Sequence, residues 1–231
     1  LNGLSNPYFP LRYKFKISKK NRRLNCGWYI LNYHDICSHQ EAVHYKKKKY
    51  ANIYTTLNNF KSHIEHMQNE GEILSVKEAL KYWETGSVKN KIIFSITFDD
   101  GLFSSIKALD QLKALNIVPT LFLNGKTFFH PKSILNNHVH LRETKNQENF
   151  CKKYFSLDDL TQLIKNKNYL FELGSHTYNH KNLSQLSLEE IDYEINQCHH
   201  YLEKSLNTKI PYFAFPFGKL NTRNYFSDKA A

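Results

Sequence analysis

Residues 92–101 read IIFSITFDDG, and the prediction of the fold starts from this segment. The apolar and β-branched residues at its start have few polar breaks, which predicts a strand buried on both faces. The strand ends at two adjacent acids, Asp99 and Asp100, and Gly101 permits a sharp turn into the next segment. Ligands bind at the carboxyl ends of parallel strands in α/β folds, so both carboxylates stand where a site is expected.

Two interpretations of the paired acids stay open on this stretch alone. Neighbouring carboxylates repel one another, and a bound cation would compensate for them, with one acid as its ligand and the other free as a base. Asp-Asp-Gly after a strand is also ordinary turn chemistry.

A second stretch, LGSHTYNH at residues 173–180, favours the metal interpretation. His176 and His180 are four residues apart, so in a helical turn they would face the same way. Such a pair is often found on a solvated helix face, but here it follows an apolar segment typical of a buried strand. Two imidazoles and one carboxylate, with a position open for water, are the ligands of a catalytic zinc site. We therefore predict His176, His180 and one of the two acids as ligands of a divalent metal, with Zn²⁺ favoured.

These stretches resemble motifs of a known family. TFDDG (97–101) and HTYNH (176–180) look like the first and second motifs of the polysaccharide deacetylases, the NodB-homology carbohydrate esterases. FAFPFG (213–218) resembles the third motif, and ILNYHDI (30–36) resembles a strand near the start of many members. The order and approximate spacing agree, and the resemblance covers about residues 29–220.

The resemblance implies an α/β fold, a distorted (β/α) barrel of the NodB-homology type that is incomplete at the C-terminus. Alternating strand and helix patterns also favour a parallel sheet. The family's final histidine, which protonates the leaving amine, has no counterpart before Ala231, and Ala214 stands where an arginine often holds the base. His34 is the upstream candidate for the proton donor, although it is equally well explained as a core histidine. Thr177 matches a loop-supporting position, where a hydrogen bond is expected.

The same resemblance implies metal-dependent hydrolysis of an N-acetyl group on an aminosugar. Asp100, His176 and His180 would hold the metal, which lowers the pKa of a bound water to about 7. Asp99 would take the proton of that water as general base. The backbone N–H of Phe217 would stabilise the oxyanion.

Composition bounds the domain organisation and the partners. The chain of 231 residues suits one α/β domain, and no apolar run is long enough to span a membrane. We predict a basic N-terminal arm at residues 1–25, a catalytic domain at 26–231 and a lid-like insertion at 125–154. The net charge of +11 suits an anionic envelope glycan, whereas the scattered lysines show no nucleic-acid motif. A periplasmic, extracellular or other cell-envelope location is favoured over the cytoplasm.

Cap residues predict where helices begin. The predicted N-caps are Thr56, Ser75, Ser156 and Ser187, and SVKE (75–78) and SLEE (187–190) read as capping boxes. Residues 41–52 are predicted as a polar loop, and Trp83 is expected to face the core.

Three functions are compatible with these motifs. The favoured one is removal of N-acetyl groups from an envelope polysaccharide or glycolipid, because both aspartates and both histidines are present. A deformylase of a lipid-linked aminosugar and a non-catalytic glycan-binding relative are the alternatives. The partner expected in each case is a carbohydrate, and the sequence leaves the oligomeric state open.

Overall fold

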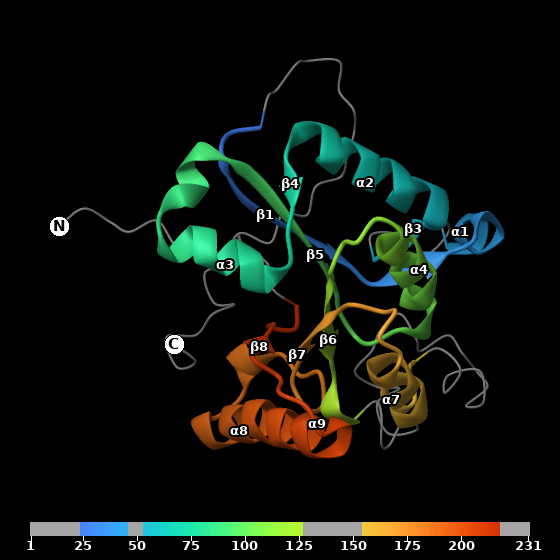
Figure 1. Ribbon diagram of the computed structural model, residues 1–231. Helices are drawn as coiled ribbons and strands as arrows, with labels where there is room; N and C mark the ends of the chain where they lie inside the picture. Colours follow the sequence, from blue (N-terminus) through green and yellow to red (C-terminus); the bar gives the residue numbers. More distant parts are fainter. Residues whose placement is uncertain (1–23, 46–52, 127–153, 218–231) are drawn as a thin grey trace.

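The computed structural model describes residues 24–45, 53–126 and 154–217 (Figure 1). The greater part of the predicted basic arm and of the lid-like insertion lies outside these ranges. No helix in the described ranges is long and apolar enough to cross a membrane.

The described chain forms an α/β fold around one curled parallel sheet (Figure 1). Its strands run in the order β1 (Gly27–Tyr33), β5 (Ile92–Phe98), β6 (Thr120–Leu123), β7 (Glu172–Ser175) and β8 (Tyr212–Phe213), and β4 (Glu72–Ile73) pairs with the start of β5. Every ladder between these strands is parallel, and β2 (Asp35–Cys37) and β3 (Tyr54–Thr56) form a separate parallel pair. This half-barrel with covering helices confirms the predicted fold class.

Helices and short helical turns connect the strands. The α-helices are α1 (His39–Tyr45), α2 (Leu57–Glu70), α3 (Val76–Glu84), α4 (Ile106–Ala114), α7 (Leu157–Lys165), α8 (Leu188–Asp192) and α9 (Cys198–Leu206). A π-helical turn, Tyr193–Gln197, joins α8 to α9, and 3₁₀ turns cover Ser87–Asn90, Phe103–Ser105 and Leu183–Gln185.

The four predicted N-caps are confirmed. Thr56 accepts a hydrogen bond from the backbone N–H of Asn59 at the start of α2. Reciprocal capping boxes begin α3, α7 and α8 at Ser75, Ser156 and Ser187. Each cap contributes about 1 kcal/mol, so the helix starts are fixed locally by the sequence.

Two local predictions are wrong. The first turn of the predicted loop at residues 41–52 belongs to α1, because Ser38 and Glu41 form a reciprocal cap. Trp83 is 39 % exposed, because α3 turns Val76 and Ala79 to the core instead.

Strand β5 is buried on both faces, as predicted. Phe94, Ile96 and Phe98 lie in the main hydrophobic cluster, whereas Ile93 packs with Ala79 in a smaller cluster beside α3. Burial on both sides holds the end of β5, and therefore the two acids after it, in a fixed position.

A half-buried carboxylate closes the amino end of the sheet. Glu172, the first residue of β7, accepts hydrogen bonds from the backbone N–H groups of Val76 and Lys77 at 3.1 Å each. It also accepts one from the Thr120 hydroxyl at 2.9 Å. These contacts tie the N-terminus of α3 to β6 and β7.

Candidate active site

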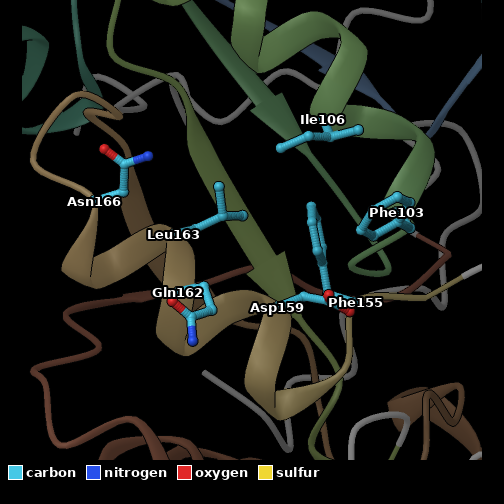
Figure 2. A pocket seen from close by; sticks show the side chains of 7 residues that line it. All are labelled: Phe103, Ile106, Phe155, Asp159, Gln162, Leu163 and Asn166. Atoms are coloured by element: carbon cyan, nitrogen blue, oxygen red, sulfur yellow. The ribbon is translucent and has the colours of Figure 1, made fainter.

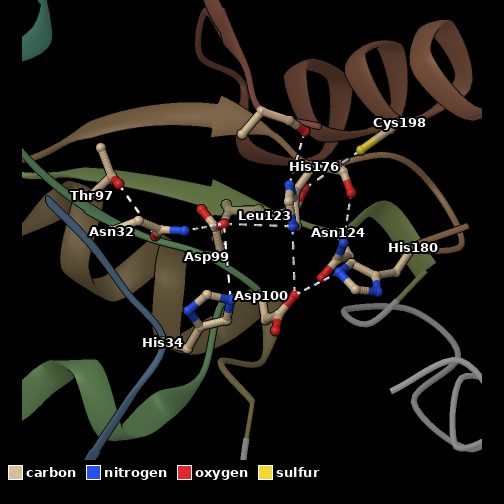
Figure 3. A network of polar contacts seen from close by, with 11 residues as sticks. Asn32, His34, Thr97, Asp99, Asp100, Leu123, Asn124, His176, His180 and Cys198 are labelled. Atoms are coloured by element: carbon tan, nitrogen blue, oxygen red, sulfur yellow. Dashed lines mark hydrogen bonds and ion pairs between the residues drawn. The ribbon is translucent and has the colours of Figure 1, made fainter. Parts of the chain in front are cut away.

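Polar groups from five strands meet at the carboxyl end of the sheet (Figure 3). The polar side chains lie in or directly after β1, β5, β6 and β7, namely Asn32, His34, Asp99, Asp100, Asn124 and His176, and the residue directly after β8, Ala214, contributes its backbone carbonyl. The parallel topology alone brings them together, since every strand ends on the same side.

Asp100, His176 and His180 form a buried group with the geometry of a metal site. Their exposed fractions are 1 %, 1 % and 6 %, and one potential ligand atom from each lies within 4.8 Å of the others. Asp100 Oδ1 is 3.2 Å from His180 Nε2 and 3.7 Å from His176 Nε2. Tetrahedral zinc with bonds of 2.0–2.1 Å separates its ligand atoms by about 3.3 Å. The donor set and the two distances from Asp100 therefore suit a divalent cation such as Zn²⁺.

A backbone contact fixes which nitrogen of His176 faces Asp100. His176 Nδ1 lies 2.9 Å from the carbonyl oxygen of Ala214, an acceptor, so this nitrogen carries the proton. In the neutral ring, Nε2 then presents a lone pair toward the carboxylate of Asp100. Two facing acceptors are stabilised by a cation between them, and an outer hydrogen bond of this kind is usual for histidine ligands. Ala214, which stands where the resemblance led us to look for an arginine, contributes its backbone carbonyl to this contact.

The loop that carries both histidines is not the helical turn expected from their spacing. Thr177 and His180 have left-handed φ angles of 65° and 55°, and no helix is assigned between them. The Thr177 hydroxyl is buried without a hydrogen-bond partner among the described residues, so its predicted hydrogen bond is not found there. The irregular backbone, rather than an i, i+4 repeat, brings the two rings to 5.0 Å between centroids.

The residues after β6 hold one side of this loop. Asn124 Nδ2 donates to the carbonyl of His176 at 2.7 Å. The backbone N–H groups of Gly125 and Lys126 donate to the carbonyls of Thr177 and Tyr178 at 3.2 and 2.9 Å.

Asn32 donates a hydrogen bond to Asp99, a contact that the sequence motifs do not predict. Asn32 Nδ2 donates to Asp99 Oδ2 at 2.7 Å, and the Thr97 hydroxyl donates to Asn32 Oδ1 at 3.3 Å, which sets the amide orientation. The register of β1 and β5 pairs Asn32 with Thr97, so correct strand alignment would have revealed this contact. Asp99 Oδ2 is also 3.8 Å from His176 Nε2, so Asp99 lies beside the group formed by Asp100, His176 and His180.

His34 and Phe217 both lie at the site. His34 Nε2 is 4.0 Å from Asp99 Oδ2, beyond hydrogen-bond length, and its side chain is 24 % exposed. The Phe217 ring contacts His180 edge-on with 4.6 Å between centroids. The structure thus brings every predicted site residue together, and the roles of all of these residues stay predictions.

Backbone strain gathers in the same place. Of the six non-glycine residues with positive φ in the described ranges, four are Asp100, Thr177, His180 and Phe217. The other two, Asn116 and Asn207, follow helix ends, where such angles are ordinary. A left-handed residue costs about 1–3 kcal/mol and persists where the surroundings impose it, typically at functional sites.

A buried phenol adjoins the acids. Tyr154 is 3 % exposed, and its pKa is raised well above the ordinary value by burial first and then by the carboxylates of Asp100 and Asp35. Its hydroxyl therefore stays protonated and neutral beside Asp100.

A cavity of about 280 Å³ lies elsewhere, between α4 and α7 (Figure 2). Its lining combines apolar side chains, from Phe103, Ile106, Phe155 and Leu163, with the polar side chains of Gln162 and Asn166. The carboxylate in its lining, Asp159, is engaged in the cap of α7. None of the predicted site residues lines this cavity, so it is separate from the site.

Solved structures share this fold. The Streptococcus pyogenes deacetylase PplD in complex with acetate has a TM-score of 0.61 at 18 % identity, over 90 % of this chain and 78 % of its own. IcaB from Ammonifex degensii gives 0.62 at 20 % identity, over 87 % and 78 %. A de-N-acetylase from Aggregatibacter actinomycetemcomitans gives 0.60 at 16 % identity, over 88 % and 83 %.

Sequence comparison identifies the family. A search of curated proteins finds no significant match. The family model described as polysaccharide deacetylase matches residues 86–229, more than half of the chain, and includes both acids and both histidines of the site. Together with the half-barrel fold, this match shows that the chain belongs to the polysaccharide deacetylase family.

Proposed function

We propose that this protein removes N-acetyl groups from the aminosugars of a cell-envelope polysaccharide or glycolipid. The observation that carries the proposal is the buried group of Asp100, His176 and His180, with a second carboxylate, Asp99, directly beside it. A purely structural role gives no reason for two adjacent acids and two imidazoles at the end of a sheet, whereas metal-assisted hydrolysis can use such side chains as metal ligands and as a base.

Three residues would hold the metal and one would act as base. Asp100, His176 and His180 would bind a divalent cation, zinc by the nature of its ligands, which supplies a water of lowered pKa and polarises the acyl oxygen. Asp99 would accept the proton of the attacking water. Asn32 would hold the Asp99 carboxylate through its hydrogen bond at 2.7 Å.

Two further residues would act on the acyl group and the leaving amine. The backbone N–H of Phe217 would donate to the oxyanion. His34, partly exposed beside Asp99, would give a proton to the amine.

The substrate would be an anionic glycan. The net charge of +11 raises the local concentration of such polymers near the protein. An envelope location, periplasmic or extracellular, follows from this substrate class and stays part of the proposal.

Acetate release from N-acetylglucosamine oligomers tests the proposal. We expect release with added zinc or cobalt, loss of release with a chelator, and loss in Asp99→Asn. Stoichiometric zinc binding without acetate release would favour the glycan-binding alternative, and formate release from an N-formylated aminosugar would favour the deformylase. Release that survives chelation would contradict metal dependence.

A further inference from the structure

Glu194 is a fully buried carboxylate outside the group of ligands and acids described above. It is 0 % exposed and lies in the π-helical turn between α8 and α9. Its Oε2 accepts from the backbone N–H of Asn179, and its Oε1 accepts from Asn179 Nδ2, both at 2.7 Å. Its backbone carbonyl accepts from the N–H of Tyr178 at 2.8 Å. One residue therefore binds two consecutive residues of the loop between His176 and His180.

The π-helical turn makes this double contact possible. In a regular α-helix the Glu194 carbonyl would accept from the N–H of Cys198. Here the Cys198 N–H donates to Ile195 instead, which leaves the Glu194 carbonyl for Tyr178. Such turns are rare and are frequently found at functional sites.

Burial of this carboxylate is costly unless its oxygens are well paired. Its charged neighbour in the described structure is Lys181, whose Nζ is 3.7 Å from Oε1 and whose side chain is 42 % exposed. The two short hydrogen bonds to Asn179 therefore provide most of the compensation. A buried hydrophobic residue would fill the same space without this cost, so the carboxylate is present for its contacts.

The loop needs such a restraint. Thr177 and His180 hold left-handed backbone angles on either side of the two bound residues. The contacts from residues 124–126 reach the first half of the loop, and Glu194 reaches Asn179, next to His180.

We propose that Glu194 is a positioning residue that sets the spacing of His176 and His180 by holding Tyr178 and Asn179. The inference rests on the proposed metal centre. We call the hydrogen bonds of Glu194 to Tyr178 and Asn179 the Glu194 clamp. Loss of this clamp lets His180 move away from Asp100, so metal affinity falls although no ligand has been changed.

A reciprocal pair of substitutions tests the clamp. Glu194→Gln places an amide donor against the Asn179 donors, and Asn179→Asp places a carboxylate against Glu194. In the double variant, the introduced amide accepts from the backbone N–H of residue 179 and donates to the introduced carboxylate, which restores both hydrogen bonds at unchanged total charge. We expect each single variant to weaken zinc binding by about 10- to 100-fold, as for outer-shell partners of metal ligands, and the double variant to recover most of it.

Zinc affinity is measured by competition with a chromophoric chelator, and the melting temperature of the metal-free protein is measured in parallel. Glu203→Gln is the matched control, because Glu203 of α9 accepts from the Ile210 N–H at 3.1 Å, away from the loop that carries the histidines. This control is expected to keep the parent zinc affinity.

The outcomes distinguish a failure of the proposed role of Glu194 from a failure of the proposed metal centre. Single variants that melt earlier but bind zinc like the parent would make Glu194 purely structural and overturn the inference. If a single variant does not fold, a folded double variant with weak zinc binding would overturn it as well. A parent protein that binds no zinc would overturn the metal centre itself, and the inference with it.

Discussion

Carboxylates at the two ends of the sheet have different neighbours. At the amino end, Glu172 accepts from three donors, two of them at the start of α3, and its charge is used to join elements. At the carboxyl end, Asp100 faces two imidazole Nε2 atoms at 3.2 and 3.7 Å, and Asp99 lies next to it in the chain. The carboxylate of Glu172 is held by N–H and O–H donors, whereas the carboxylate of Asp100 lies against two imidazoles and belongs to the proposed cation site.

The largest effect expected from this contrast is in Asp100→Asn. Zinc affinity should fall by more than about 100-fold, since even outer-shell changes cost 10- to 100-fold. The metal-free protein should melt no earlier than the parent, because one of two neighbouring charges is removed. Chelator competition and thermal melting measure the two quantities. If Asp100→Asn bound zinc as tightly as the parent, Asp100 would not be a metal ligand, and the contrast with Glu172 would fail.

Asp99→Asn should separate chemistry from metal binding at the carboxyl end. We expect kcat for acetate release to fall by about 10²- to 10⁴-fold, the contribution of a general base. Zinc affinity should stay close to that of the parent, because Asp99 is outside the ligand set. A parent-like kcat would show that another group takes the proton.

Glu172→Ala should produce the opposite pattern. The N–H groups of Val76 and Lys77 and the Thr120 hydroxyl lose their acceptor, so the free energy of unfolding should fall by about 1–3 kcal/mol in urea denaturation. Zinc affinity should not change. A parallel loss of zinc binding would mean that the two ends are coupled through the sheet.

The smallest expected effect is that of Asn32→Ala. One hydrogen bond to the Asp99 carboxylate is lost, so kcat should fall by about 10-fold with zinc affinity unchanged, equivalent to about 1.4 kcal/mol. Asn32→Asp, which has the same shape but opposes Asp99 with a like charge, should lower kcat further. Equal activity in both variants and the parent would show that Asp99 needs no orienting partner.

Local signals account for the part of the fold that the sequence predicts well. Cap residues such as Ser75 and Ser187 mark helix starts because their hydrogen bonds join residues three apart. The buried run of β5 and the alternation of strand and helix specify a parallel sheet, and that topology places Asp100 and His176 at one edge. The cap at Ser38 is equally local, and the same pattern would have predicted α1.

Contacts between distant segments account for what the sequence did not reveal. Asn32 and Glu194 occupy polar positions of a strand and a helix, where a solvent-facing side chain is the default expectation. Their partners, Asp99 and Asn179, are 67 and 15 residues away, and each contact depends on strand register or on an irregular helical turn. The left-handed angle of Thr177 likewise arises from the surrounding structure, since a β-branched residue disfavours it.

The π-helical turn at Tyr193–Gln197 makes the length of a helix part of the site. Regular α-helix advances about 100° per residue, so removal of one residue here would restore a continuous helix and rotate what precedes it relative to α9. Glu194 would then lose its contacts with the loop that carries the histidines, although every proposed metal ligand would still be present in the sequence. In this segment we therefore expect a single-residue deletion to lower zinc affinity more than most substitutions do, and homologues can be compared by the residue count between the second histidine and α9.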